Sequence, residues 1–234
     1  MGEAEGWRMT SARDDILANI HRSLGVTGNE RLRNAAVDAR IAGAPRGVIP
    51  DRAQVDHSEQ IELFKRMAVF AAATVVEVSN AEDAPQAIAA YLRDQNLPAT
   101  IRIGDDPRLT AMPWDKTSLE VGHGRSDGND LNAVSHAFGG VAETGTLAMI
   151  SGHENPTTLN FLPDNHIVVV DAADIRGDLE TLWGRLREKT GKGVMPRTVN
   201  LITGPSRSAD IEQTLLLGAH GPRNLHIVVV RPGS

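Results

Sequence analysis

The sequence predicts an α/β protein in which helices flank a mainly parallel or mixed β-sheet. Two copies of the pentapeptide HIVVV occupy residues 166–170 and 226–230, and both are almost entirely apolar. Continuous apolar runs of this kind are typical of strands that are buried on both faces of a sheet. Helical and strand patterns also alternate through the middle of the chain, as they do in α/β proteins. We therefore expect a core sheet that is covered by helices on both sides.

The N-terminal part of the chain predicts a helical arm. Ser11 and Asp14 have the spacing of a capping box, apolar residues then recur on one helical face, and Gly25 ends the pattern. Residues 25–56 hold few large apolar side chains, so we expect a mobile linker or lid there, or an arm that packs on a partner subunit. The predicted division is an N-terminal helix and flexible arm at 1–55 and one α/β domain at 56–234.

Within the predicted α/β domain, helices and strands follow from hydrophobic periodicity. Helices are expected after Asp56, after Asn80 and around residues 179–186, where Leu179, Leu182 and Leu186 share one face. β-Branched or alternating runs predict the strands, which we place at 74–78, 100–103, 118–121, 131–135, 146–150, 166–170, 198–202 and 225–230.

Composition excludes several classes of function. Aromatic residues make up 3% of the 234 residues and the net charge is -6, which argues against a nucleic-acid-binding surface. The chain has no cysteine, so it has no disulfide, no catalytic thiol and no cysteine-held iron–sulfur cluster. No stretch approaches the roughly 18 consecutive apolar residues of a membrane helix. The N-terminus lacks the apolar segment of a secretory signal, so we expect a cytoplasmic protein without a membrane span.

The first candidate site is the segment that precedes the strand at 146–150. It contains Glu143, Thr144, Gly145 and Thr146 behind a pair of glycines. A glutamate beside hydroxyl groups at a strand end can act as a nucleophile, a general base or a ligand clamp. The same pattern is also typical of a surface turn with a solvated glutamate, so both interpretations stay open.

The second candidate site follows the strand at 198–202. Its glycine, serine hydroxyls, arginine and helix start resemble an anion-binding loop, with candidate ligand residues Gly204, Ser206, Arg207, Ser208 and Asp210. Asp210 has an alternative role as a helix cap, and Arg207 an alternative as a solvated or salt-bridged side chain. His220 and Gly221 lie in a glycine-rich turn close behind, where the histidine either enters a site or is an exposed turn residue.

Histidines at positions 123, 136, 153 and 220 are candidate metal ligands, and His153 and Glu154 in the segment 151–155 suit acid–base or metal chemistry by residue type. They lack the spacing of a recognisable metal motif, so no metal site is predicted. His166 begins a strand, and we expect it to be a structural histidine that bonds a neighbouring loop.

Three segments together resemble a known family. They are GGVAETGTLAMIS, FLPDNHIVVV and LITGPSRSADIEQTLLLGAHGPRNLHIVVV, and they are similar to the LUD domain, more closely to lactate-utilisation proteins of the LutC type. The resemblance covers roughly residues 60–234. It implies a Rossmann-like fold of the NagB/RpiA/CoA-transferase group with its site at strand ends. The candidate residues 143–146, 204, 206–208, 210, 220 and 221 lie in or beside these motifs.

The resemblance also implies a function. It suggests a part in oxidising L-lactate to pyruvate beside two iron–sulfur partner proteins, with a small carboxylate as the ligand. Because the chain has no cysteine, it resembles the cluster-free component, and no intrinsic cofactor is expected. Whether the chain is itself an enzyme stays open. The alternatives are a transferase or isomerase that uses Glu143, by analogy with CoA-transferases, and a non-catalytic ligand-binding or assembly protein.

Overall fold

The computed structural model describes residues 11–191, 193–208, 216–218 and 220–231. The chain divides into two units, Met1–Gly47 and Val48–Ser234. The predicted domain boundary at residues 55 and 56 stays a prediction.

The first unit contains two helices, α1 (Ala12–Leu24) and α2 (Arg31–Gly43). Ser11 and Asp14 form the expected capping box of α1, and Gly25 ends the helix in the left-handed conformation. The sequence pattern predicts no helix between residues 25 and 56, yet α2 forms there. Its alanine, arginine and leucine residues have high helix propensity, which the apolar periodicity does not measure. No residue of α1 or α2 is buried.

The second unit is built on a six-stranded sheet whose paired strands are all parallel. Its order is β1-β12-β7-β4-β2-β3. The strands are β1 (Thr74–Val78), β12 (Asn224–Val230), β7 (Asn165–Asp171), β4 (Asn132–His136), β2 (Thr100–Ile103) and β3 (Glu120–His123). The predicted mainly parallel α/β fold is therefore confirmed.

A second, mixed sheet has the order β8-β5-β6-β9. It consists of β8 (Ile175–Arg176), β5 (Gly139–Val141), β6 (Thr146–Ile150) and β9 (Val199–Ile202). A short antiparallel pair joins β10 (Arg207–Ser208) to β11 (Leu216–Leu217). The sequence analysis did not anticipate this sheet as a separate layer, because β5 and β8 have only three and two residues, too few for a detectable period.

Helices and short 3₁₀ turns connect these strands. The helices are α3 (His57–Phe70), α4 (Ala84–Asp94), α5 (Pro107–Thr110), α6 (Thr157–Phe161) and α7 (Leu179–Thr190). The 3₁₀ turns are η1 (Asp51–Ala53), η2 (Ala81–Asp83), η3 (Trp114–Lys116) and η4 (Ala172–Asp174). None of the helices in the described residues has the length and apolar character that a membrane crossing requires.

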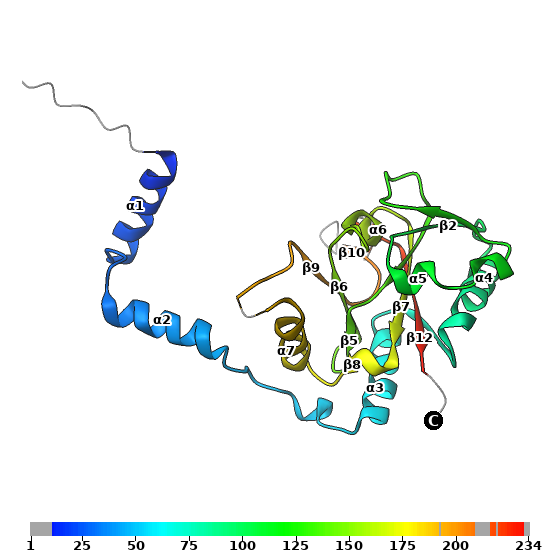
Figure 1. Ribbon diagram of the computed structural model, residues 1–234, viewed down its shortest axis with the longest axis horizontal. Helices are drawn as coiled ribbons and strands as arrows, with labels where there is room; N and C mark the ends of the chain where they lie inside the picture. The colour runs from blue at the N-terminus through cyan, green and yellow to red at the C-terminus, as the bar shows by residue number, and fades with distance from the viewer. Residues whose placement is uncertain (1–10, 192, 209–215, 219, 232–234) are drawn as a thin grey trace, which may run out of the picture. The chain divides into compact units, whose positions relative to one another are not determined.

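The two HIVVV runs lie side by side in β7 and β12 and face two different cores. Val168 and Val170 pack with α3 and the mixed sheet, whereas Ile167 and Val169 pack with α4, α5 and η3. Alternate residues of β12 divide in the same way. A third cluster joins the far face of the mixed sheet to Leu182 of α7. The result is a layered unit, with α4 and α5 on one side of β7 and β12 and with α3 and the mixed sheet on the other (Figure 1).

Parallel pairing places the carboxyl ends of β2, β4 and β7 at the same edge of the central sheet. Asp106 follows β2, His136 ends β4 and Asp171 ends β7. The carboxyl edge of an open α/β sheet is where such folds bind ligands. The fold thus brings polar residues from three distant segments together at one edge.

Candidate functional site

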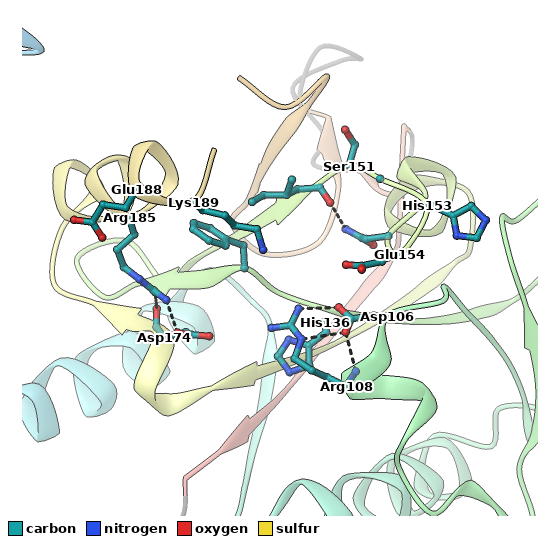
Figure 2. Close-up of a pocket in the computed structure, with 14 residues that line it drawn as sticks. Asp106, Arg108, His136, Ser151, His153, Glu154, Asp174, Arg185, Glu188 and Lys189 are labelled. Atoms are coloured by element: carbon teal, nitrogen blue, oxygen red, sulfur yellow. Dashed lines mark hydrogen bonds and ion pairs between the residues drawn. The ribbon is translucent and has the colours of Figure 1, made fainter. Parts of the chain in front are cut away.

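A cavity of about 730 Å³ opens at the carboxyl edge of β2 and β4. Charged and polar side chains from five segments surround it (Figure 2). We call it the charged cavity, and its lining residues are Asp106, Arg108, His136, Phe138, Ile150–Asn155, Asp174, Arg185, Glu188 and Lys189.

The loop at 151–155 closes one side of the charged cavity by packing against the end of β2. A Cβ atom on Gly104 would stand 2.0 Å from the carbonyl oxygen of Glu154, so only glycine permits this approach. The Asn155 side chain holds the loop from within, because its Nδ2 donates to the carbonyl of Ile150 at 3.2 Å. His153 lies at the tip, 88% exposed, with its Nδ1 3.1 Å from Asp105 Oδ2.

Asp106, which is buried, and Arg108, whose side chain is 44% exposed, form an ion pair on the floor of the cavity. The Asp106 carboxylate caps α5 by accepting the Arg108 amide at 2.9 Å, and it also accepts the guanidinium at 3.0 and 2.7 Å. Burial raises the pKa of Asp106, but these bonds outweigh it and hold the pKa below its ordinary value. In turn, burial lowers the pKa of Arg108, and the bonds to Asp106 outweigh it and raise that pKa.

His136 stands beside this pair and is almost fully buried. Its Nδ1 lies 3.0 Å from the carbonyl oxygen of Ala137, so Nδ1 carries the proton and donates it to that oxygen. Its Nε2 is 3.6 Å from Asp171 Oδ2. Burial, and after it the charge of Arg108, lowers the pKa of His136. The imidazole is therefore neutral at pH 7, with a lone pair on Nε2 that accepts a hydrogen bond or a proton.

The opposite wall belongs to α7. Arg185 bonds the carboxylate of Asp174 and, through Nη1, its carbonyl oxygen at 3.0 Å. Lys189 lies one turn further on, with its Nζ 5.8 Å from the centre of the Phe138 ring. Among the described residues Lys189 has no carboxylate within ion-pair distance, unlike the two arginines of the cavity. Lys189 is thus a cation that is available to a bound anion.

This arrangement can bind a small anionic molecule and accept a hydrogen bond or proton from it. Lys189 and Arg108 supply positive charge, and His136 supplies a neutral base, within one water-accessible cavity. Within the described residues, no three histidine or carboxylate side chains converge in a way that would hold a metal ion.

The predicted residue Glu143 lies outside the charged cavity. Its side chain is 7% exposed, and Oε1 accepts the amide of Leu179 at 3.1 Å. Leu179 is the first residue of α7, so the carboxylate is placed where a helix N-terminus favours negative charge. This contact accounts for the buried carboxylate, and a nucleophilic role for Glu143 stays a prediction.

The residues after Glu143 link the two predicted segments. The Thr146 hydroxyl lies 2.7 Å from that of Thr144 and 2.7 Å from that of Thr203, which begins the second segment. Gly145 is the tight turn between the first two threonines, with φ of 66°. The structure therefore brings the two motifs into contact through hydroxyl groups.

The second segment surrounds a separate, smaller cavity at the amino ends of β7 and β12. Gly204, Ser206, His220 and Gly221 all line it. Arg207 donates to the carbonyl of Ala71, outside the lining, and Ser208 pairs with Leu216 in the β10–β11 ladder. Asp210 lies outside the described residues. Whether these residues bind a ligand stays a prediction.

The sequence analysis singled out His153 and Glu154 but did not group them with the other residues of the charged cavity. Asp106 and His136 were accessible in principle, because each follows or ends a correctly predicted strand at the carboxyl edge. Arg185 and Lys189 carried no signal, since charged residues on an amphipathic helix are normally solvated. His136 appeared only as one of several possible metal ligands.

Comparison with known proteins supports the resemblance. The LUD domain family model matches residues 132–230, from β4 to the end of β12. This part of the chain is therefore similar to the LUD domain, and the predicted resemblance is confirmed.

Several relatives carry the name lactate utilization protein C. That of Geobacillus thermodenitrificans strain NG80-2 is 32% identical over 146 residues, 55% of this chain and 61% of the relative. This alignment thus covers less than two thirds of that relative. That of Geobacillus kaustophilus strain HTA426 is 26% identical over 234 residues, 96% of this chain and 82% of the relative. An uncharacterized protein of Neisseria meningitidis serogroup B is 29% identical over 242 residues, 95% of this chain and 94% of its own.

A crystal structure of a DUF162 family protein from Deinococcus radiodurans has the same fold. It superposes with a TM-score of 0.53 at 23% identity, and the match covers 75% of this chain and 99% of the other. At this identity the likeness establishes the fold alone.

Proposed function

We propose that this protein takes part in lactate utilisation and binds L-lactate or its product, pyruvate, in the charged cavity. The relatives named lactate utilization protein C supply the substrate class. The observation that carries the site is the placement of neutral His136 beside Arg108 at the carboxyl edge of the sheet. A 2-hydroxy acid presents a carboxylate and a hydroxyl group, and this cavity offers a partner to each.

In this proposal the carboxylate pairs with Lys189 and with the edge of the Arg108 guanidinium that faces away from Asp106. The 2-hydroxyl group donates to His136 Nε2, whose lone pair is free because Nδ1 already donates to Ala137. Asp106 holds the Arg108 guanidinium from the other side, and the Ala137 carbonyl fixes the His136 ring through Nδ1. Pyruvate lacks the hydroxyl donor, so the cavity favours lactate over pyruvate when Nε2 is unprotonated.

We propose further that the chain is the cluster-free subunit of the system. It has no cysteine with which to hold an iron–sulfur cluster. Electrons from lactate therefore pass through iron–sulfur partner proteins, while this chain binds and positions the small carboxylate without an intrinsic cofactor. The site of action in this proposal is the cytoplasm.

Calorimetric titration of the purified chain with L-lactate, pyruvate and propionate tests the ligand. Lys189→Gln is expected to weaken binding of all three at least fivefold, because all three carry a carboxylate. His136→Gln is expected to weaken L-lactate selectively over propionate, which has no hydroxyl group. Lys116→Gln, at an exposed lysine outside the cavity, is the matched control. Equal affinities in the Lys189 and Lys116 variants would refute the proposed site.

Growth on L-lactate as sole carbon source tests the role. Deletion of the gene for this protein should abolish growth on L-lactate, and expression of the wild-type protein should restore growth. If Lys189→Gln restores growth as well as wild type does, ligand binding is dispensable and an assembly role replaces the proposed one. Gentle affinity purification should recover iron–sulfur proteins, and their absence would argue against the subunit role.

A further inference from the structure

The small cavity at the amino ends of β7 and β12 holds two buried polar side chains with unused bonding capacity. The cavity measures about 200 Å³, the space of roughly seven waters at about 30 Å³ each. We call it the second cavity. Its lining is Asn160, Phe161, His166, Leu201–Ser206, His220–Pro222 and Leu225.

His166 and Asn160 are each 1% exposed and are joined through Ser135. His166 Nε2 lies 3.1 Å from Ser135 Oγ, and Ser135 Oγ donates to Asn160 Oδ1 at 3.3 Å. Ser135 itself does not line the cavity, whereas both of its partners do. Their other ends, His166 Nδ1 and Asn160 Nδ2, have no hydrogen-bond partner among the described residues.

The Ser135 hydroxyl determines what these two open ends offer. Because its single proton goes to Asn160, its oxygen must accept from His166, and the histidine proton is therefore on Nε2. His166 Nδ1 is then an acceptor and Asn160 Nδ2 a donor. If the relay ran in the opposite direction, with the amide turned over, the open ends would exchange roles. Either direction leaves one donor and one acceptor.

The lining also fixes the charge that the second cavity can accept. Among the described residues no aspartate, glutamate, lysine or arginine lines it. Burial lowers the pKa of His166 to about 3, so this ring supplies no positive charge at pH 7. Phe161, Leu201, Ile202 and Leu225 form an apolar part of the remaining wall, and Thr203, Ser206 and His220 add polar side chains. An anion would lose its hydration there without gaining a counter-ion.

We propose that the second cavity is a binding site for a small uncharged molecule that carries a hydroxyl or primary amide group on an apolar body. Either group donates one hydrogen bond and accepts another, so it satisfies both buried open ends at once. An unsatisfied buried donor and acceptor are otherwise costly, and native proteins rarely retain them. The site is distinct from the charged cavity, and it does not depend on the proposed role in lactate utilisation.

Butyramide and butyrate are matched probes for this site. They have the same size and shape, but only the amide is uncharged and both donates and accepts. Two-dimensional ¹H–¹⁵N correlation of the histidine rings in the wild-type chain reports directly on His166. Butyramide should shift the His166 Nδ1 resonance, and butyrate should require at least a tenfold higher concentration for the same shift. An unmoved resonance with butyramide, or equal shifts with both probes, would overturn the proposal.

A pair of neighbouring variants locates the probe. Phe161 lines the cavity and is 40% exposed, whereas Leu162 is 47% exposed and does not line it. Phe161→Trp should fill the cavity and weaken butyramide binding at least tenfold, whereas Leu162→Trp should leave it within twofold of wild type. Equal binding in the two variants would place the probe elsewhere and refute the assignment. L-Lactate binding should be the same in both, which separates this test from that of the charged cavity.

Discussion

Gly145 lies directly against the backbone of Ala68 in helix α3. A Cβ atom on Gly145 would stand 2.3 Å from the Ala68 nitrogen, and the φ angle of Gly145 is 66°. Both constraints select glycine, because a side chain here would be strained and would also collide with main-chain atoms that cannot move aside. The turn at 143–146 is thereby locked to α3, which explains a glycine in this motif without any ligand.

Replacing Gly145 is therefore expected to destabilise the folded state. Gly145→Ala should lower the free energy of unfolding by at least about 2 kcal/mol, since backbone strain and overpacking add. Urea denaturation measures this change in the free energy of unfolding. Gly184, inside α7, has no atom within 4 Å of the added carbon, so Gly184→Ala should instead stabilise by about 1 kcal/mol through helix propensity. Loss of stability in both variants would contradict this account of Gly145.

Glu143 is expected to act on stability through α7. Glu143→Gln keeps an oxygen for the Leu179 amide but removes the negative charge from the helix N-terminus, so we expect a loss of about 1 kcal/mol in the free energy of unfolding. Glu180→Gln removes a charge from the same first turn without this buried bond, and its effect should be smaller. Unchanged stability together with lost growth on lactate would favour a chemical role for Glu143.

Buried histidines should make the protein less stable in mild acid. Burial lowers the pKa of His226 to about 4, while the unfolded chain titrates near 6.5. Between these values the unfolded state binds a proton that the folded state does not, so stability falls as pH falls, by about 1 kcal/mol per pH unit for this histidine. Stability is unaffected by this group above about pH 6.5.

His226→Gln should make the fall in unfolding free energy between pH 6.5 and 4 shallower by about that amount. Loss of the ring also removes its stacking on Tyr91, at 3.8 Å between centroids, so an offset at pH 7 is expected as well. The test is the slope of the unfolding free energy against pH, and the difference at pH 7 does not decide it. His123→Gln, at an exposed histidine, should keep the wild-type slope; an equal change of slope in this control would argue against the assignment.

Arg108 should control the protonation of both of its neighbours. In Arg108→Gln, Asp106 loses its counter-ion and the positive charge beside His136 disappears. We expect the pKa of Asp106 and that of His136 both to rise, because Arg108 lowers both in the wild type. Proton NMR titration of the His136 ring measures the second effect. Arg93→Gln, at an exposed arginine on α4, should leave the His136 titration unchanged.

Most of the central sheet was predictable from local pattern. The strands at 74–78, 100–103 and 146–150 have the predicted limits, and the two HIVVV runs are buried on both faces as expected. The mixed sheet was not recognised as a layer, because β5 and β8 are too short to show a period. Helix α2 was missed because its residues favour a helix through propensity without an apolar stripe.

The amino-acid sequence by itself determined the α/β class, the burial of both faces of the HIVVV strands and the LUD resemblance. These features depend on periodicity and on contiguous motifs. Only the tertiary structure decided which polar residues meet. Asp106, His136 and Lys189 come from separate elements, and parallel pairing of β2 with β4 together with the packing of α7 brings them to one cavity. The donor and acceptor of the second cavity depend likewise on one serine proton held between α6 and β7. Convergence of this kind is a property of distances in space, and the order of residues along the chain does not encode it locally.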